Sequence, residues 1–419
     1  MIFSASRFCL ILVLYSTLLL LSCVPATVPS AQVEVPAVTV ITPSAEVRAP
    51  IVTSIAPSSA AQVPVITVTP LATPTIQPGF VAADGSRPLT FPADLGAHPD
   101  FRTEWWYYTG NLQTKEGRHF GFELTIFRVG LLPPTIELPA DSKWSGRDVY
   151  FAHFALSDIA TDHFYAFQRY SRPGPGLAGA EADPYRVWLE DWNITERTPA
   201  VYELQAEQEE ITLNLTLTDE MGIVLQGKSG YSRKGKNRTN ASYYYSQPRL
   251  QADGSVQING IEYLVSGLAW NDHEFSTGVL DENQIGWDWF SLQFEDGPAL
   301  MLFQLRERGG EISDSASGTF IAADGTSQSL HKSDFEIAAL DQWHSPHTQG
   351  TYPSSWEIRI HKPDCLLKIQ PWMADQEVNF PPVTYWEGAV HFEGNCNDVP
   401  TRGNGYVELT GYAGNLPLP

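Results

Sequence analysis

The sequence is poor in cysteine, in basic residues and in long apolar runs, and each shortage excludes a class of protein. Only 4 of its 419 residues are cysteines, too few for a disulfide scaffold or an iron–sulfur protein. Lys and Arg number 26 against 48 Asp and Glu, which gives a formal net charge of −22. Such a surface repels phosphates, so we expect no nucleic acid partner.

One apolar run lies close to the N-terminus, over Phe8–Ser22. It is too short for a comfortable membrane span and is typical of a signal peptide. The run ends in Leu20-Leu21-Ser22 directly before Cys23, which resembles the bacterial lipobox. We therefore predict that residues 1–22 are a lipoprotein signal peptide and that Cys23 is lipidated. The protein would be exported to a bacterial cell envelope and anchored to the membrane, outside the cytoplasm.

Residues 23–79 are rich in Pro, Val, Thr, Ala and Ser and contain few charges. Proline recurs every few residues, and each one fixes φ and removes a backbone donor, so the Val and Thr runs between them cannot join a central strand. We predict a largely disordered tether that holds the folded part away from a membrane surface.

Residues 80–419 have the pattern of an all-β protein. Apolar and polar residues alternate over 211–217, and Phe120, Phe122 and Leu124 share one face of a predicted strand. Asp-Gly pairs separate many such segments, and no long amphipathic helix is evident. We expect two consecutive lipocalin-like β-barrel or sandwich domains, over 80–250 and 251–419.

Two literal motif matches do not indicate nucleotide binding. Residues 222–229 fit the P-loop expression, but their middle, Ile-Val-Leu, is typical of a strand rather than of a loop that cradles phosphates. Residues 174–179 fit the dinucleotide fingerprint without a βαβ unit around them. His344 and His347 lack a neighbouring third ligand, so we expect no metal, no nucleotide and no other cofactor.

Cys365 and Cys396 are the two cysteines that follow the tether. In an oxidising compartment they could form a disulfide between neighbouring C-terminal strands. The alternative is two unpaired thiols.

Two clusters combine aromatic with acidic side chains. The first is residues 98–110, where strand alternation puts Glu104, Trp106 and Tyr108 on one face and Trp105 and Tyr107 on the other. The second comprises 270–275 and 286–290, where Asp272 and Glu274 face away from His273, and Trp287 and Trp289 flank Asp288. Charged groups among so many aromatic rings cost free energy unless they are paired or functional.

The order of these motifs resembles the AttH/carotenoid 1,2-hydratase (CrtC-like) family over roughly residues 80–415. The matching segments are 104–110, 122–128, 150–158, 243–246, 270–274, 286–290, 385–390 and 405–412. The resemblance implies a pair of lipocalin-like barrels. It also implies cofactor-independent hydration of a tertiary alkene of an acyclic carotenoid.

This chemistry needs a protonated acid, and a carboxyl group buried among aromatics keeps its proton. Aromatic faces stabilise the resulting cation. The resemblance assigns the acid to Asp288 or Asp272, water handling to His273 and cation stabilisation to Trp287. The other predicted substrate-binding residues are Trp289, Trp106, Tyr108, Glu104, Phe275 and Trp270.

Three functions stay open on the sequence alone. The first is a hydratase or related lyase that acts on an apolar, isoprenoid-like small molecule. The second is a non-catalytic, lipocalin-like carrier of hydrophobic ligands. The third is a carbohydrate-active β-protein, because paired carboxylates and Trp platforms also suit sugars. A structural alternative is that the Asp272 and His273 cluster is a buried polar network between the barrels.

Overall fold

The computed structural model describes residues 79–138, 146–278 and 280–414. The predicted signal peptide, Cys23 and nearly all of the predicted tether lie outside these ranges. Within them the chain is nearly all β, as the sequence predicted, with three single-turn 3-10 helices, Ala93–Leu95 (η1), Ile159–Thr161 (η2) and Lys332–Asp334 (η3). None of the described helices is long and apolar enough to cross a membrane.

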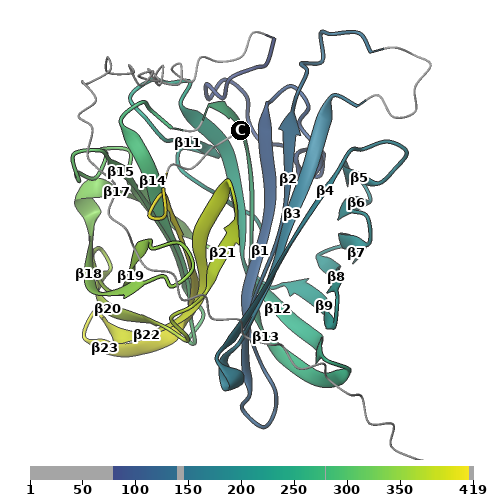
Figure 1. The fold of residues 1–419 in the computed structure, drawn as a ribbon. Coiled ribbons are helices and arrows are strands. Elements are labelled where there is room, and N and C mark those ends of the chain that lie inside the picture. The colour runs from purple at the N-terminus through teal and green to yellow at the C-terminus, as the bar shows by residue number, and fades with distance from the viewer. Residues whose placement is uncertain (1–78, 139–145, 279, 415–419) are drawn as a thin grey trace, which may run out of the picture. The chain divides into compact units, whose positions relative to one another are not determined.

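The first sheet contains the strands up to residue 278, in the order β4-β3-β2-β1-β13-β12-β9-β8-β7-β6-β5, and β10 and β11 pair with β12 (Figure 1). Its strands are β1 Thr103–Gln113, β2 His119–Gly130, β3 Asp148–Asp158, β4 His163–Ser171, β5 Ala178–Ala182, β6 Tyr185–Leu189, β7 Trp192–Thr198, β8 Val201–Gln208, β9 Ile211–Asp219, β10 Val224–Leu225, β11 Tyr231–Arg233, β12 Ala241–Ile258 and β13 Ile261–Gly278.

The second sheet follows in the order β17-β16-β15-β14-β23-β22-β20-β19-β18, with β21 paired to β22. Its strands are β14 Gln284–Phe294, β15 Ala299–Glu307, β16 Ser317–Ile321, β17 Ser327–His331, β18 Phe335–His344, β19 Thr351–His361, β20 Asp364–Pro371, β21 Glu377–Phe380, β22 Val383–Cys396 and β23 Val399–Thr410.

Each sheet is barrel-like and surrounds its own apolar core. In the first, alternate residues of β9, such as Ile211, Leu213 and Leu215, point into a core shared with β1, β2 and β12. In the second, Trp356 and Ile358 of β19 pack against residues of β14 and β23. The alternation seen in the sequence therefore buries one face of each strand, as a curved antiparallel sheet requires.

The first sheet ends with β13 at Gly278, and the second begins with β14 at Gln284. The predicted division at residues 250 and 251 falls inside β12, because the hairpin after it belongs to the first sheet. Asn259 and Gly260 both have positive φ, the conformation of a tight hairpin turn. The returning strand β13 runs back between β12 and β1, so it completes the first sheet rather than opening the second.

The sheets contact each other through the outer faces of β1, β2, β12 and β13 on one side and β14, β22 and β23 on the other. At Gly121 the backbones approach so closely that a Cβ atom would lie 2.5 Å from Cβ of Ala389. Polar side chains also cross the interface: Asn111 donates to the Gly405 carbonyl at 2.8 Å and Gln293 to that of Ala269 at 2.9 Å.

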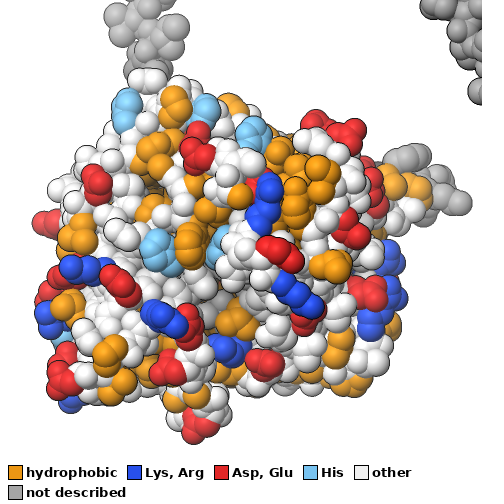
Figure 2. Space-filling model, turned by 90° about the horizontal axis from the view of Figure 1, so that it is seen from below, with side chains coloured by type: hydrophobic (Ala, Val, Ile, Leu, Met, Phe, Trp, Pro, Cys, Tyr) orange, Lys and Arg blue, Asp and Glu red, His pale blue; other side chains and the backbone are white. Residues whose placement is uncertain are grey.

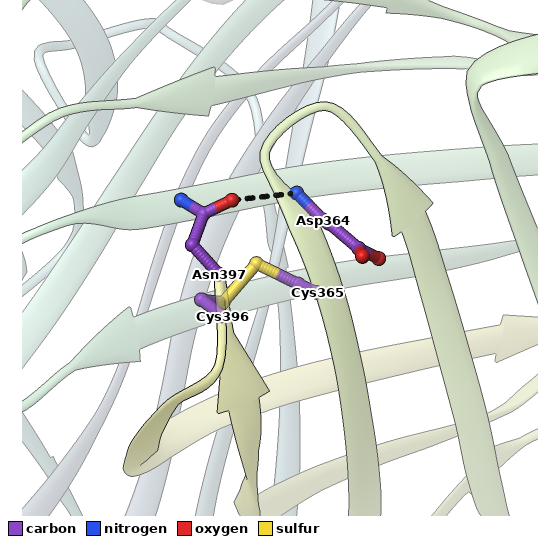
Figure 3. Close-up of a disulfide and its surroundings, with 4 residues drawn as sticks. All are labelled: Asp364, Cys365, Cys396 and Asn397. Carbon is purple, nitrogen blue, oxygen red and sulfur yellow. Dashed lines mark hydrogen bonds between the residues drawn. A yellow bond between two sulfur atoms is a disulfide. The ribbon is translucent and has the colours of Figure 1, made fainter.

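A disulfide joins Cys365 of β20 to Cys396 of β22, which are direct cross-strand partners (Figure 3). Beside it the Asp364 backbone N–H donates to the side-chain oxygen of Asn397 at 3.2 Å. The bond thus fastens one end of the second barrel.

The outer surface mixes charges of both signs. On the face in Figure 2, acidic and basic side chains are interspersed with apolar groups and several histidines, without a continuous basic area.

Candidate functional site

A cavity of about 140 Å³ lies between the outer faces of the two sheets. One wall comes from β1, β2, β3, β12 and β13, and the other from β14, β15, β22 and β23. The cavity therefore belongs to neither barrel core but to the space enclosed where the barrels meet. Aromatic side chains form most of its walls, among them Trp105, Tyr107, Phe127, Phe151, Trp287, Trp289 and Phe303.

Strand alternation decides which predicted residues reach this cavity. On β1, Trp105 and Tyr107 line it, whereas Trp106 and Tyr108 point into the first barrel core. On β13, Asp272 and Glu274 line it, and His273 points the other way, as the sequence pattern predicted. The first sheet is buried on both faces here, so one set of side chains builds the core and the other builds the cavity.

Glu123 of β2 is a buried carboxyl group that lines the cavity. Its Oε1 accepts hydrogen bonds from Thr125 at 2.8 Å and from the Tyr385 hydroxyl at 3.1 Å. Its Oε2 is buried and has no partner among the described residues. Burial raises the pKa of Glu123 to about 7, in spite of the two hydrogen bonds, which lower it. At neutral pH much of this group keeps its proton.

A chain of hydrogen bonds through Tyr385 and His153 orients Glu123. The Tyr385 hydroxyl lies 2.6 Å from His153 Nδ1, and His153 Nε2 lies 2.8 Å from the side-chain nitrogen of Gln168. Burial lowers the pKa of His153 to about 3, so its ring is neutral. A Gln168 amide that donates to Nε2 leaves the proton on Nδ1, which then donates to Tyr385, and Tyr385 donates to Glu123. Every bond in the chain then points toward Oε1.

Asp272 is held more tightly than Glu123. Its Oδ1 accepts from Ser246 at 2.5 Å and from the Trp270 indole at 2.7 Å, and its Oδ2 accepts from the Tyr244 hydroxyl at 2.5 Å. Burial raises its pKa to about 7 against these three donors. Asp272 therefore combines a raised pKa with oxygens that are already engaged.

Glu408 of β23 is a further acid that lines the cavity. Burial raises its pKa to about 8, helped by the charges of Glu123, Glu274 and Asp272, while a hydrogen bond from the Trp287 indole at 2.8 Å lowers it. Next to it, outside the cavity lining, Glu387 accepts from the Tyr107 hydroxyl at 2.5 Å, and its Oε2 is without a partner among the described residues. Burial, together with the charges of Glu123 and Glu408, holds the pKa of Glu387 well above its usual range.

Among the described residues, a single ammonium group lines the cavity. Lys234 Nζ lies 2.9 Å from Glu274 Oε1, and Ser242 donates to the same oxygen. The ammonium also lies 4.2 Å from the centre of the Phe303 ring. Lys234 thus neutralises Glu274, and the other three carboxyl groups of the cavity have no cation from residues 79–138, 146–278 and 280–414.

Glu104 and His273 form a separate cluster on the opposite face of the first sheet. Glu104 Oε1 lies 2.6 Å from His98 Nδ1 and 2.8 Å from His273 Nε2, and its Oε2 lies 2.8 Å from Arg128 Nε. Burial raises the Glu104 pKa, but the histidines and Arg128 outweigh it and hold that pKa well below its usual range. Phe275 stacks on His98 with ring centres 3.6 Å apart.

His98, Glu104 and His273 are also the one set of three with metal-ligand spacing among the described residues. Their ligand atoms already bond to one another, and the Arg128 guanidinium occupies the remaining carboxylate oxygen. A cation brought to this point would meet the positive charge of Arg128, so the donor set fits an internal ion-pair network better than a metal centre.

Asp288 points away from the cavity, into the second barrel. It bonds to Arg306 Nε at 3.0 Å, Gln304 at 2.8 Å and the Tyr412 hydroxyl at 3.0 Å. Burial raises its pKa, and Arg306 limits that rise. Its neighbours Trp287 and Trp289 line the cavity, which follows directly from strand alternation.

The structure thus brings together Asp272, Trp287, Trp289 and Trp270 at or beside the cavity, and it places Asp288, His273, Glu104, Trp106, Tyr108 and Phe275 elsewhere. Sequence reasoning missed Glu123 and Glu408. Glu123 sits opposite Phe122 and Leu124 in an alternating strand, the usual sign of a solvated face. The available signal was the apolar Phe127 and Val129 on that same face.

The AttH-like family model matches residues 82–412. A putative AttH protein from Nitrosomonas europaea is 37% identical, with 80% of this chain and 99% of that chain covered and a TM-score of 0.71. Kievitone hydratase from Nectria haematococca shares the fold at 14% identity, with 80% and 96% covered and a TM-score of 0.60. CghA, in a structure with Sch210972, matches at 11% identity, with 80% and 95% covered and a TM-score of 0.50. No curated protein matches.

Proposed function

Because this chain belongs to the AttH-like family, a family whose fold is shared by a hydratase, we propose that its cavity performs acid-catalysed hydration of an alkene in an apolar small molecule. The observation that carries the proposal is the Glu123 carboxyl group. It combines a pKa raised to about 7 with an Oε2 that has no partner among the described residues, on a side chain that lines an aromatic cavity. A general acid needs both properties.

Glu123 Oε2 donates its proton to the less substituted alkene carbon, and the π electrons form the new C–H bond. The other carbon becomes a tertiary carbocation, which the faces of the surrounding aromatic side chains stabilise through their quadrupoles. Water adds to that carbon, and its extra proton returns to the Glu123 carboxylate. The products are one alcohol and a regenerated acid, so the step needs no cofactor.

Asp272 was predicted as an acid and lines the cavity. In this proposal it holds aromatic residues of the cavity wall in position. Its bonds to Tyr244 and Trp270 fix two aromatic residues, and Tyr244 in turn accepts from the Trp289 indole at 3.1 Å. Loss of Asp272 would therefore loosen the aromatic wall that faces the carbocation.

The size of the cavity limits the reacting part of the substrate. An engineered apolar cavity of roughly 150 Å³ holds one benzene ring. A volume of about 140 Å³ therefore fits a branched five-carbon unit, such as the end of an isoprenoid chain. The rest of a longer substrate would lie outside the cavity.

The proposal is tested with the folded part, residues 79–419, and a soluble aromatic compound that carries a prenyl group. In ¹⁸O-labelled water we expect a product heavier by one labelled water, detected by mass spectrometry. Glu123→Gln should reduce the rate at least 100-fold, because the amide cannot donate an acidic proton.

Two variants make the result decisive. Glu393→Gln changes an exposed acid of β22 and should leave the rate unchanged. Asp288→Asn tests the sequence-based assignment: loss of activity there, with full activity in Glu123→Gln, would place the acid in the second barrel instead. Retention of the compound without any mass change would favour a carrier.

We also propose that the protein is exported and lipid-anchored at Cys23. The disulfide supports export, since such bonds persist in oxidising compartments. Growth of the producing cells with a fatty acid that carries an alkyne should label the full-length protein. Cys23→Ser should abolish the label and release the protein from the membrane fraction, and a variant that stays lipid-labelled would refute the anchor.

A further inference from the structure

The acids of the cavity outnumber its cations. Within the described part of the chain, four carboxyl groups line it, from Glu123, Asp272, Glu274 and Glu408, against the single ammonium of Lys234. Lys234 is bonded to Glu274, and the other three carboxyl groups have no ion pair among the described residues. Three acidic groups of the cavity therefore have no neutralising cation within the part of the chain that the structure describes.

An unpartnered buried oxygen points to a group that comes from outside. Glu123 is 1% exposed, and no described residue donates to its Oε2, although the side chain lines the cavity. A buried polar atom without a partner is costly, and native proteins seldom leave one without a reason. A donor or a positive charge on a bound molecule would remove that cost.

The shape of the site distinguishes a metal ion from an organic cation. Among the described residues, the cavity acids do not converge to the spacing of metal ligands, which is found only in the Glu104 cluster. The side chains of Trp105, Trp287 and Trp289 line the same cavity as these acids. Aromatic faces together with carboxyl groups are the features that recognise quaternary ammonium groups.

We propose that the cavity binds small organic ammonium ions, which occupy it in place of the alkene, with the charge beside Glu408 and Glu123 and the methyl groups against Trp287 and Trp289. The inference uses the same cavity as the proposed function and adds a ligand class to it. A permanent ammonium ion resembles a tertiary carbocation in shape and charge, so walls suited to one suit the other.

Binding of the cation should release protons. The pKa values of Glu123 and Glu408, about 7 and about 8, are raised chiefly by burial. A positive charge placed between them favours their ionised forms and lowers both pKa values. At pH 7 the complex therefore forms with loss of protons to the buffer.

The test compares (2-hydroxyethyl)trimethylammonium with its neutral isostere, 3,3-dimethylbutan-1-ol, by isothermal titration calorimetry on the full-length protein at pH 7. We expect the cation to bind at least tenfold more tightly. We also expect an apparent enthalpy that changes with the ionisation enthalpy of the buffer, the signature of proton release. Equal affinities or stronger binding of the neutral alcohol would overturn the inference.

Glu408→Gln should remove most of the preference for the cation, whereas Glu393→Gln, on the exposed face of β22, should keep it. If Glu408→Gln does not fold, the buffer dependence of the unmodified protein decides, because absence of proton release contradicts the inference directly. Hydration activity without cation binding would refute this inference alone, and cation binding without hydration would refute the proposed reaction alone.

Discussion

Glu104 and Glu123 show that burial alone does not determine the charge of an acid. Both side chains are almost fully buried on adjacent strands, yet their pKa values move in opposite directions. Glu104 contacts two histidines and Arg128, which stabilise its carboxylate, whereas Glu123 contacts only hydroxyl groups. The first is suited to an internal ion pair and the second to giving up a proton.

Replacement of Glu123 by Gln should stabilise the protein at high pH. Because the folded-state pKa is raised, its stabilising contribution is complete below pH 4.5 and is lost as the pH rises toward 7. The rise from 4.5 to about 7 corresponds to about 3 kcal/mol. We therefore expect Glu123→Gln to be more stable than the unmodified protein at pH 9, by urea denaturation. Its stability should also depend less on pH between 5 and 8, where Asp272 and Glu408 still titrate.

Glu104→Gln is the matched control for that measurement. It leaves Arg128 buried with a weaker partner, so we expect destabilisation by about 3–5 kcal/mol near pH 7. A Glu123→Gln variant that behaved like Glu104→Gln would mean that Glu123 is ionised in the folded protein.

At the scale of elements, the close approach of β2 and β22 sets the separation of the sheets. A Cβ at Gly121 would lie 2.5 Å from that of Ala389. Gly121→Ala should therefore destabilise the protein by about 1–3 kcal/mol, as overpacked cores do, and weaken ligand binding in the neighbouring cavity. Thermal unfolding and calorimetry measure the two effects.

The reciprocal exchange tests the cause. Adding Ala389→Gly to Gly121→Ala moves the methyl group to the other strand and should restore most of the lost stability. If the destabilisation of the double variant equals the sum of the two single effects, Gly121 is required for its backbone conformation and not for the contact with Ala389.

The disulfide between β20 and β22 should contribute stability without affecting the cavity. It closes a loop over a sequence separation of 31 residues, for which chain entropy predicts about 3–4 kcal/mol. Addition of dithiothreitol, or the double change of Cys365 and Cys396 to Ser, should lower the urea midpoint accordingly. Hydration rates per folded molecule should stay the same, and a lower rate would link this end of the barrel to the site.

For the molecule as a whole, the place where the first sheet ends has a direct consequence for fragments. A fragment of residues 79–250 lacks β13, the strand that joins β1 to β12. We expect it to lack stable β structure by circular dichroism and amide exchange. Residues 79–278 contain every strand of the first sheet and should form it, and a folded 79–250 fragment would contradict this account.

Much of the fold follows from the sequence, and only part of the site does. Alternation and turn residues predict the strands, and the spaced aromatic motifs predict the family. The face of β13 that carries Asp272 was predicted correctly, because period-2 geometry depends on local sequence alone. Local sequence does not show that Asp288 points into the second barrel or that Glu123 faces the second sheet. Both depend on contacts between residues more than 100 positions apart, which no local pattern records.

The cavity is enclosed by outward-facing side chains of two barrels whose cores are packed separately. Residues that shape the ligand space therefore differ from residues that hold each barrel together, even when they are neighbours on one strand. Mutations can alter what the cavity accepts without opening either core. Such a division allows the specificity of related proteins to diverge during evolution while their common architecture is retained.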